Sequence, residues 1–130
     1  MTEHSTDRAF PLIFAGHVAD TASFYSKLGF VEAKRNPPVG EPTYIALRRG
    51  PFELAVVDAS WPRQRYGGMV GDLPRFEMFV LVDDLEGTLD RLADDGVTTL
   101  REPVVMPWGE RIAYVADPDG NPVALACQGA

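Results

Sequence analysis

The chain contains two copies of one sequence pattern, separated by a constant offset of 67 residues. Residues 10–30 and 77–97 align without a gap. The matched pairs are Leu12 with Phe79, Phe14 with Leu81, Val18 with Leu85, Thr21 with Thr88, Tyr25 with Leu92 and Gly29 with Gly96. A repeat of this kind is typical of a supersecondary unit that recurs along the chain. The sequence therefore predicts two similar modules.

Each copy begins with the pattern of a strand followed by a short helix. An alternating apolar run predicts the strand, and apolar residues spaced three and four positions apart then predict one face of the helix. Gly29 and Gly96 stand at the predicted helix ends, where glycine adopts the left-handed conformation without a steric penalty from Cβ. Phe30 and Val97 follow them and are predicted to begin the next strand.

Three further strand-like runs follow each predicted helix. In the first copy they cover residues 30–34, 43–47 and 52–57, and in the second copy residues 98–105, 111–116 and 122–126. The last two runs of each copy are joined by turn sequences rich in Pro and Gly, at residues 49–51 and 117–121, which predict hairpins. Each module is thus predicted to be βαβββ, and the fold class to be α+β.

The organisation along the chain follows from these modules. We expect a disordered tail over residues 1–8, a first module over 9–58, an inter-module loop over 59–74 and a second module over 75–130, all within one structural domain. The loop is rich in Gly, Pro and Arg, and loops of this length often carry function. We interpret it as a lid or rim over a pocket, with a dimer contact or a simple cover for the core as alternatives.

Composition excludes several partners. The chain has 130 residues and a formal net charge of −7, which opposes attraction to nucleic acids and to anionic membranes and favours a neutral or cationic ligand. Its apolar runs are far shorter than the roughly 20 residues of a membrane-spanning helix. Residues 1–8 lack the basic and apolar regions of a signal peptide, so we expect a cytoplasmic protein. The single cysteine, Cys127, cannot form an internal disulfide and is interpreted as a small apolar filler.

Three motifs carry a family resemblance. Residues 24–30 (FYSKLGF) lie in the first module, and residues 107–109 (PWG) and 117–121 (DPDGN) in the second. Together with the paired βαβββ modules, they resemble the vicinal oxygen chelate superfamily, which includes glyoxalase I, extradiol dioxygenases, fosfomycin-modifying enzymes and bleomycin-binding resistance proteins. The resemblance implies curved, mixed four-stranded sheets that form incomplete barrels, often completed by a second chain in a homodimer with two pockets.

The resemblance also implies where metal ligands would stand. Enzymes of the family place four ligands, usually His, Gln or Glu, on the first and last strands of the two modules. Aligning the two modules of this chain puts Phe10, Glu53, Glu77 and Ala124 at those positions. Two of the four have no donor atom, and transition-metal sites typically need at least three protein ligands with imidazole or thiolate among them. His17 falls at a predicted helix start and not at one of these positions, so it does not supply the missing imidazole. We therefore expect no metal and no other cofactor.

A cavity without a metal is similar to that of the family's drug-binding branch, whose members hold an antibiotic against aromatic side chains without changing it. We therefore expect a non-catalytic protein that sequesters an aromatic or extended natural product in an aromatic pocket between subunits and confers antibiotic resistance. One alternative is an enzyme of the glyoxalase, epimerase or dioxygenase kind, a lyase or isomerase using Glu53 and Glu77. Another is a structural or regulatory domain without a ligand.

Ten side chains are candidate ligand contacts. They are Phe10, Tyr44, Glu53, Trp61, Tyr66, Glu77, Phe79, Met106, Trp108 and Tyr114. Aromatic rings present large faces to planar ligands, and Met adapts to irregular apolar ones. For each apolar residue, packing in the core or in a hairpin is the alternative. For the two glutamates, the alternative is exposure to water or an ion pair with an arginine such as Arg111.

Overall fold

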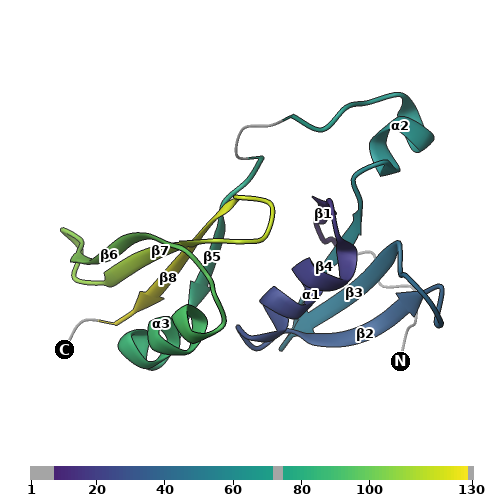
Figure 1. Ribbon diagram of the computed structural model, residues 1–130. Coiled ribbons are helices and arrows are strands. Elements are labelled where there is room, and N and C mark those ends of the chain that lie inside the picture. Colours follow the sequence, from purple (N-terminus) through teal and green to yellow (C-terminus); the bar gives the residue numbers. More distant parts are fainter. Residues whose placement is uncertain (1–7, 72–74, 129–130) are drawn as a thin grey trace. The chain divides into compact units, whose positions relative to one another are not determined.

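A computed structural model describes residues 8–71 and 75–128 (Figure 1). The first module contains β1 (Leu12–Ala15), α1 (Val18–Ser26), β2 (Val31–Asn36), β3 (Tyr44–Arg49) and β4 (Phe52–Asp58), and is followed by α2 (Trp61–Tyr66). The second module contains β5 (Met78–Leu81), α3 (Leu85–Asp94), β6 (Thr99–Val105), β7 (Arg111–Ala116) and β8 (Pro122–Cys127). The chain divides into two compact units, of which the first ends at Gly67 and the second begins at Gly68.

Each unit holds one four-stranded sheet with the same topology. The strand order is β1-β4-β3-β2 in the first unit and β5-β8-β7-β6 in the second. In both sheets the first two strands of this order are parallel and the other neighbours are antiparallel. The α+β class, the βαβββ modules and the mixed sheets that the sequence predicts are therefore confirmed.

One helix covers one face of each sheet. α1 contacts all four strands of the first sheet (Figure 1). The buried positions Ile13 and Ala15 alternate along β1 with the half-buried Leu12 and Phe14, so the two faces of this strand differ in burial. On α3, the buried residues Leu85, Thr88 and Leu92 form the corresponding inner face of the second helix. Since each sheet has one such helix, each keeps a second face that its helix does not cover.

The two helices end in the same way, which explains the strongest part of the repeat. After α1, the Phe30 N–H donates to the Tyr25 carbonyl at 3.3 Å and the Gly29 N–H to the Ser26 carbonyl at 3.2 Å. The equivalent bonds after α3 run from Val97 to Leu92 at 2.9 Å and from Gly96 to Ala93 at 3.0 Å. This is the Schellman pattern, which needs a residue with positive φ. Gly29 and Gly96 supply it, with φ of 93° and 83°.

The predicted inter-module loop, residues 59–74, contains a helix that the sequence analysis did not predict. α2 covers residues Trp61–Tyr66 and ends at Gly67, whose φ is 74°. Residues 72–74 of the same segment lie outside the described residues, as do residues 1–7 of the predicted tail. The first run after α1 is also shifted, since β2 begins at Val31 and ends at Asn36 instead of covering 30–34.

Within the described residues, no helix is long and apolar enough to cross a membrane. The longest, α3, has 10 residues, about half the length that the hydrocarbon core of a bilayer requires.

The two Schellman glycines provide a matched test of backbone strain. An alanine at either position must adopt positive φ, which costs about 1–2 kcal/mol. A Cβ at Gly96 meets nothing within 4 Å, whereas a Cβ at Gly29 would lie 3.1 Å from Arg49 Nε, which itself donates to the Leu28 carbonyl at 2.8 Å. Both alanine variants should lower the free energy of unfolding in urea titrations, Gly29→Ala by more than Gly96→Ala. The reverse order would contradict this explanation.

Candidate ligand-binding site

A pocket of about 480 Å³ lies in the first unit. Its lining comes from β2, the start of β3, the end of β4 and the segment that includes α2. The lining residues are Lys34, Asn36, Thr43, Tyr44, Asp58, Ser60, Trp61, Gln64 and Arg65. A pocket of this volume is in the range that holds a small organic ligand, roughly 300–1,000 Å³.

The strands place three of these side chains on one face of the sheet. Lys34 and Asn36 are two residues apart on β2, so both side chains leave the same face. Asn36 is directly opposite Tyr44 on β3, which adds the tyrosine ring to that face. The residue after Tyr44, Ile45, is fully buried on the other face. The floor of the pocket is therefore the face of the sheet that α1 leaves uncovered.

A turn at the end of β4 positions α2 against this face. Asp58 Oδ2 accepts hydrogen bonds from the Ser60 N–H, at 2.9 Å, and from the Ser60 hydroxyl. These bonds lower the pKa of the Asp58 carboxyl below its ordinary value, so the group is ionised at neutral pH. Trp61 follows directly and begins the helix.

The first turn of α2 brings two predicted contact residues together. The rings of Tyr44 and Trp61 have centroids 6.1 Å apart and planes inclined by 35°. The Arg65 guanidinium lies over the Trp61 ring, 4.1 Å from its centroid, in the geometry of a cation–π contact. The pocket thus combines an aromatic pair with a cation held on one of its rings. Tyr66, which was predicted with Trp61, is 67% exposed and does not line the pocket.

The predicted contacts Phe10 and Glu53 form a separate cluster in the same unit. Arg8 donates two short hydrogen bonds to the Glu53 carboxylate, from Nε to Oε2 and from Nη2 to Oε1, both at 2.8 Å. Its guanidinium also lies 4.8 Å from the centroid of the Phe10 ring. The hydrogen bonds from Arg8 lower the pKa of Glu53, and the charge of Arg8 adds to the effect. Glu53 therefore has an arginine partner, but Arg8 and not Arg111, which pairs with Glu86.

Three predicted contacts belong to the apolar face of the second sheet. Tyr114 and Met106 pack against a small cluster formed by Ile112, Ala124 and Ala126, which are all buried. Phe79 is the β5 neighbour of Ala124, and half of its surface is exposed. None of these three residues is among the lining residues of the pocket in the first unit.

The last two predicted contacts are exposed. Trp108 is 67% exposed, and its Nε1–H donates to Glu110 Oε1 at 2.8 Å. Glu77 precedes β5 and is also exposed. Neither lies among the lining residues of the pocket.

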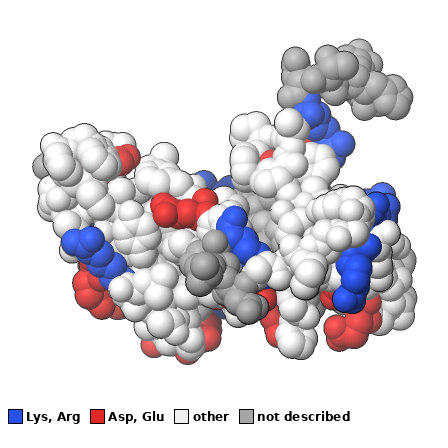
Figure 2. All heavy atoms as spheres, turned by 90° about the horizontal axis from the view of Figure 1, so that it is seen from above, with Lys and Arg blue, Asp and Glu red and all other residues white. Residues whose placement is uncertain are grey.

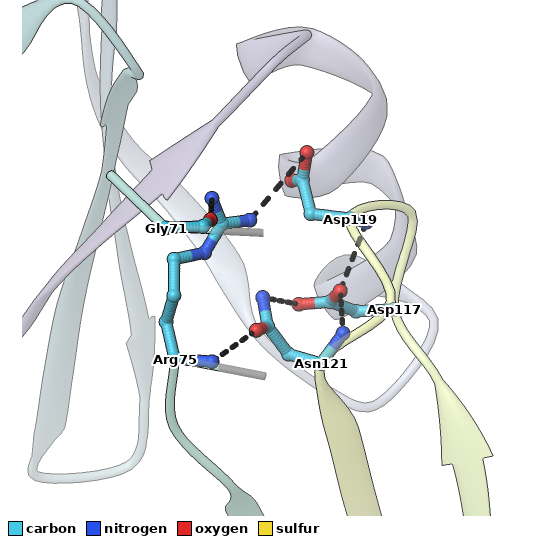
Figure 3. A network of polar contacts seen from close by, with 5 residues as sticks. All are labelled: Gly71, Arg75, Asp117, Asp119 and Asn121. Atoms are coloured by element: carbon cyan, nitrogen blue, oxygen red, sulfur yellow. Dashed lines mark hydrogen bonds and ion pairs between the residues drawn. The ribbon is translucent and has the colours of Figure 1, made fainter. Parts of the chain in front are cut away.

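The DPDGN turn holds a buried polar network (Figure 3). Asp117 Oδ1 accepts from the backbone N–H groups of Asp119 and Asn121, each at 2.9 Å. The Asn121 side chain donates to Asp117 Oδ2 at 3.1 Å and accepts from the Arg75 N–H at 3.0 Å. Arg75 also approaches Asp119, at 3.9 Å. The network fixes the β7–β8 turn to the segment that leads into β5, so the motif has a structural role.

Comparison with known proteins identifies the family. Residues 7–125 match the family model of the glyoxalase/bleomycin resistance protein/dioxygenase superfamily. The chain belongs to this superfamily. No protein with a curated description matches the chain significantly in sequence.

Several solved structures share the fold. A glyoxalase-related enzyme from Fulvimarina pelagi is 25% identical, with a TM-score of 0.77 over 95% of this chain and 89% of that one. A bleomycin resistance determinant encoded on the transposon Tn5 is 23% identical, with a TM-score of 0.65 over 96% and 100%. TioX from Micromonospora sp. ML1 is 18% identical, with a TM-score of 0.70 over 95% and 97%.

In this member of the superfamily, the strand register corrects the predicted set of metal positions. Leu12 on β1 pairs with Ala55, and its repeat partner Phe79 on β5 pairs with Ala124. Ala124 is therefore equivalent to Ala55, and Glu53 is equivalent to Pro122. The sequence alignment was wrong by two residues because it matched Pro51 with Pro122, whereas Pro51 lies in the turn and Pro122 begins a strand.

The corrected positions do not fit the metal of the superfamily's enzymes. The register leaves two equivalent pairs on the last strands, which are Glu53 with Pro122 and Ala55 with Ala124. With either pair, at least two of the four positions have no donor atom, and the Glu53 carboxylate is engaged by Arg8. Across residues 8–71 and 75–128, no three His, Cys, Asp or Glu side chains come together as a metal site. His17 is exposed at the start of α1, as predicted.

Most of the polar lining of the pocket is not evident from the sequence alone. Lys34 and Asn36 look like ordinary surface residues of an edge strand, and only the alternation along β2 places them on one face. Gln64 and Arg65 share the pocket because they are on a helix. The signals for that helix were present, since Pro62 stands in its first turn and Gly67 at its end.

The ion pair of Glu53 predicts a pH effect. Replacing Arg8 with Met should raise the pKa of Glu53 toward its ordinary value of about 4.3, as measured by NMR titration of the carboxyl carbon. Because the pKa is lower in the folded than in the unfolded protein, the pair stabilises the fold above the unfolded pKa. This stabilisation is lost as the pH falls through the folded pKa. The variant should therefore lose less stability on acidification.

Arg35→Met is the matched control for this titration. It removes another glutamate–arginine pair of the first unit, with Glu32, and should leave the pKa of Glu53 unchanged. An equal change of the Glu53 pKa in both variants would show that the effect is general and not due to Arg8.

The network of the DPDGN turn predicts a large loss of stability for Asn121→Ala. Asn121 is fully buried, and the substitution leaves the Arg75 N–H and Asp117 Oδ2 each without the side-chain partner shown in Figure 3. The free energy of unfolding should fall by about 2–4 kcal/mol in urea titrations. Asp94→Ala, on the exposed end of α3, should change it by less than about 0.5 kcal/mol. Equal effects of the two substitutions would contradict a structural role for the turn.

Proposed function

We propose that the protein is a non-catalytic binding protein that sequesters an aromatic or extended natural product in the cytoplasm and thereby confers antibiotic resistance. The observation that carries the proposal is the pocket of the first unit, where Tyr44 and Trp61 present an aromatic pair among polar side chains. Aromatic faces bind flat ligands over a large area with little loss of side-chain entropy. The surrounding amides, hydroxyls and charged groups would orient the ligand by hydrogen bonds.

The residues at the positions where the superfamily's enzymes carry their metal ligands favour a binding protein over an enzyme. Phe10 before β1 and both Pro122 and Ala124 on β8 offer no ligand atom to a metal. Glu53 is held by Arg8 with both carboxylate oxygens engaged. The hydrogen bonds that lower the pKa of Glu53 also make it a weaker base, so it is poorly suited to remove a proton from a substrate. The bleomycin resistance determinant with the same fold is consistent with a role in resistance.

We extend the proposal to a homodimer. The uncovered face of the second sheet carries Phe79 and Leu81, which are 51% and 50% exposed, beside buried apolar residues. Exposed apolar surface of this kind is often covered by another protein chain. Sedimentation equilibrium should give twice the mass of the chain, and a monomer at micromolar concentration would contradict this part of the proposal.

The function is tested by a binding screen in which the ligand is recovered. Planar antibiotics are titrated against the purified protein while tryptophan fluorescence is followed, and the bound compound is then extracted and identified by mass spectrometry. Saturable quenching with recovery of unchanged compound supports sequestration. Conversion of the compound to a product contradicts it and favours an enzyme of the superfamily, as does binding that requires a stoichiometric divalent metal.

Trp61 should contribute most of the stacking energy. Trp61→Ala should weaken the binding of a planar ligand by about 1–3 kcal/mol, as measured by isothermal titration calorimetry, and Trp61→Phe should retain much of the affinity. Trp108→Ala is the matched control, because Trp108 lies in the other unit and outside the pocket. If only Trp108→Ala weakens binding, the ligand site is on the second unit and the assignment of the pocket is wrong.

A further inference from the structure

The charges around the pocket differ from the charge of the chain. The chain as a whole carries a formal −7, and basic and acidic side chains are interspersed on the face shown in Figure 2. The pocket is lined by two basic side chains, Lys34 and Arg65, and by one acidic side chain, Asp58. Because salt screens charges beyond about 8–10 Å, a bound ligand responds mainly to these lining groups.

The two basic groups are available to a ligand. Among the described residues, neither Lys34 nor Arg65 has an ion-pair partner, whereas other arginines of the first unit, Arg8 and Arg35, are paired with glutamates. Lys34 comes from β2 and Arg65 from α2, so the two cations reach the pocket from different elements. Arg65 is in addition held on the Trp61 ring, which keeps its charge beside the aromatic pair.

The acidic group is already engaged within the protein. Asp58 accepts two hydrogen bonds from Ser60, and these connect the end of β4 to the start of α2. Its role in the turn accounts for the presence of a carboxylate in the lining. The remaining polar groups that face the pocket include the amides of Asn36 and Gln64, which can donate hydrogen bonds to oxygen atoms of a ligand.

We infer that this pocket binds a planar aromatic acid, with its ring against Tyr44 and Trp61 and its ionised acidic group between Lys34 and Arg65. The inference rests on the proposed function and names the class of ligand for the same pocket. Packed aromatic rings have centroids about 4.5–7 Å apart, so Tyr44 and Trp61 at 6.1 Å are in direct contact and the ligand ring lies beside the pair. A cationic ligand is disfavoured, since Arg65 already occupies the cation–π position on Trp61.

The test uses three probes that share one ring system. 2-Naphthoic acid, 2-naphthamide and 2-naphthylmethylamine are anionic, neutral and cationic at pH 7, and their dissociation constants are measured by isothermal titration calorimetry at low salt. Hydrogen bonds to ionised groups are stronger than those between neutral groups. The acid should therefore bind about fivefold or more tightly than the amide, and the amine most weakly. The preference for the acid should shrink as salt screens the charges.

Two substitutions and two matched controls locate the effect. Lys34→Met and Arg65→Gln should each reduce the ratio between acid and amide affinity, with little loss of amide binding. Lys27→Met removes the chain's other lysine, at the end of α1, and Arg63→Gln removes another arginine of α2 outside the lining. Both controls should leave the ratio unchanged. Circular dichroism and urea unfolding confirm that each variant is folded.

The outcomes separate the two proposals. Equal binding of all three probes, or tighter binding of the amine, overturns the aromatic acid while leaving an aromatic binding pocket, provided that Trp61→Ala still weakens binding. A preference for the acid that survives both Lys34→Met and Arg65→Gln overturns the placement of the acidic group. Failure of all three probes to bind below about 1 mM overturns the inference together with the aromatic pocket on which the proposed function is based.

Discussion

A four-stranded sheet with a single helix can cover only one of its faces, and this constraint determines where the protein can bind anything. In each unit the helix is stopped by a Schellman glycine, which returns the chain to the sheet after α1 or α3 and keeps the helix on one side. The buried side chains of β1 and of the helix then form the core of the unit. The opposite face remains for another structure or a ligand.

The two units share one topology, but their uncovered faces differ. In the first unit, the chain continues past β4 into α2, which adds Trp61 and Arg65 beside a polar strand edge and creates a pocket. In the second unit the same face carries the half-exposed apolar side chains Phe79 and Leu81. The second unit also has the longer hairpin turn, which is fixed by buried hydrogen bonds of Asn121. The two repeats therefore share the same sheet topology and helix ending, and they differ on the faces that the helices leave uncovered.

Sequence patterns predicted the frame because they arise from local rules. The offset of 67 residues, the strand alternation and the two helix-ending glycines are all visible without any long-range contact. α2 was missed because six residues are too few to show a helical period, although Pro62 and Gly67 mark its start and end. The register of β4 was misjudged because a proline in a turn resembles a proline that begins a strand. The pocket brings Lys34 of β2 together with Trp61 and Arg65 of α2, a combination that no local pattern contains.

The position of Arg65 has a consequence for how selective the pocket can be. Its guanidinium lies 4.1 Å from the centroid of the Trp61 ring, on a surface that a flat molecule would otherwise cover. A ligand that stacks on that side must first move the Arg65 side chain, so Arg65 competes with the ligand for the face of the Trp61 ring. Only a molecule that offers the displaced cation a new partner recovers the lost contact. The pocket thereby gives up affinity for flat molecules in general and discriminates among them by their charge.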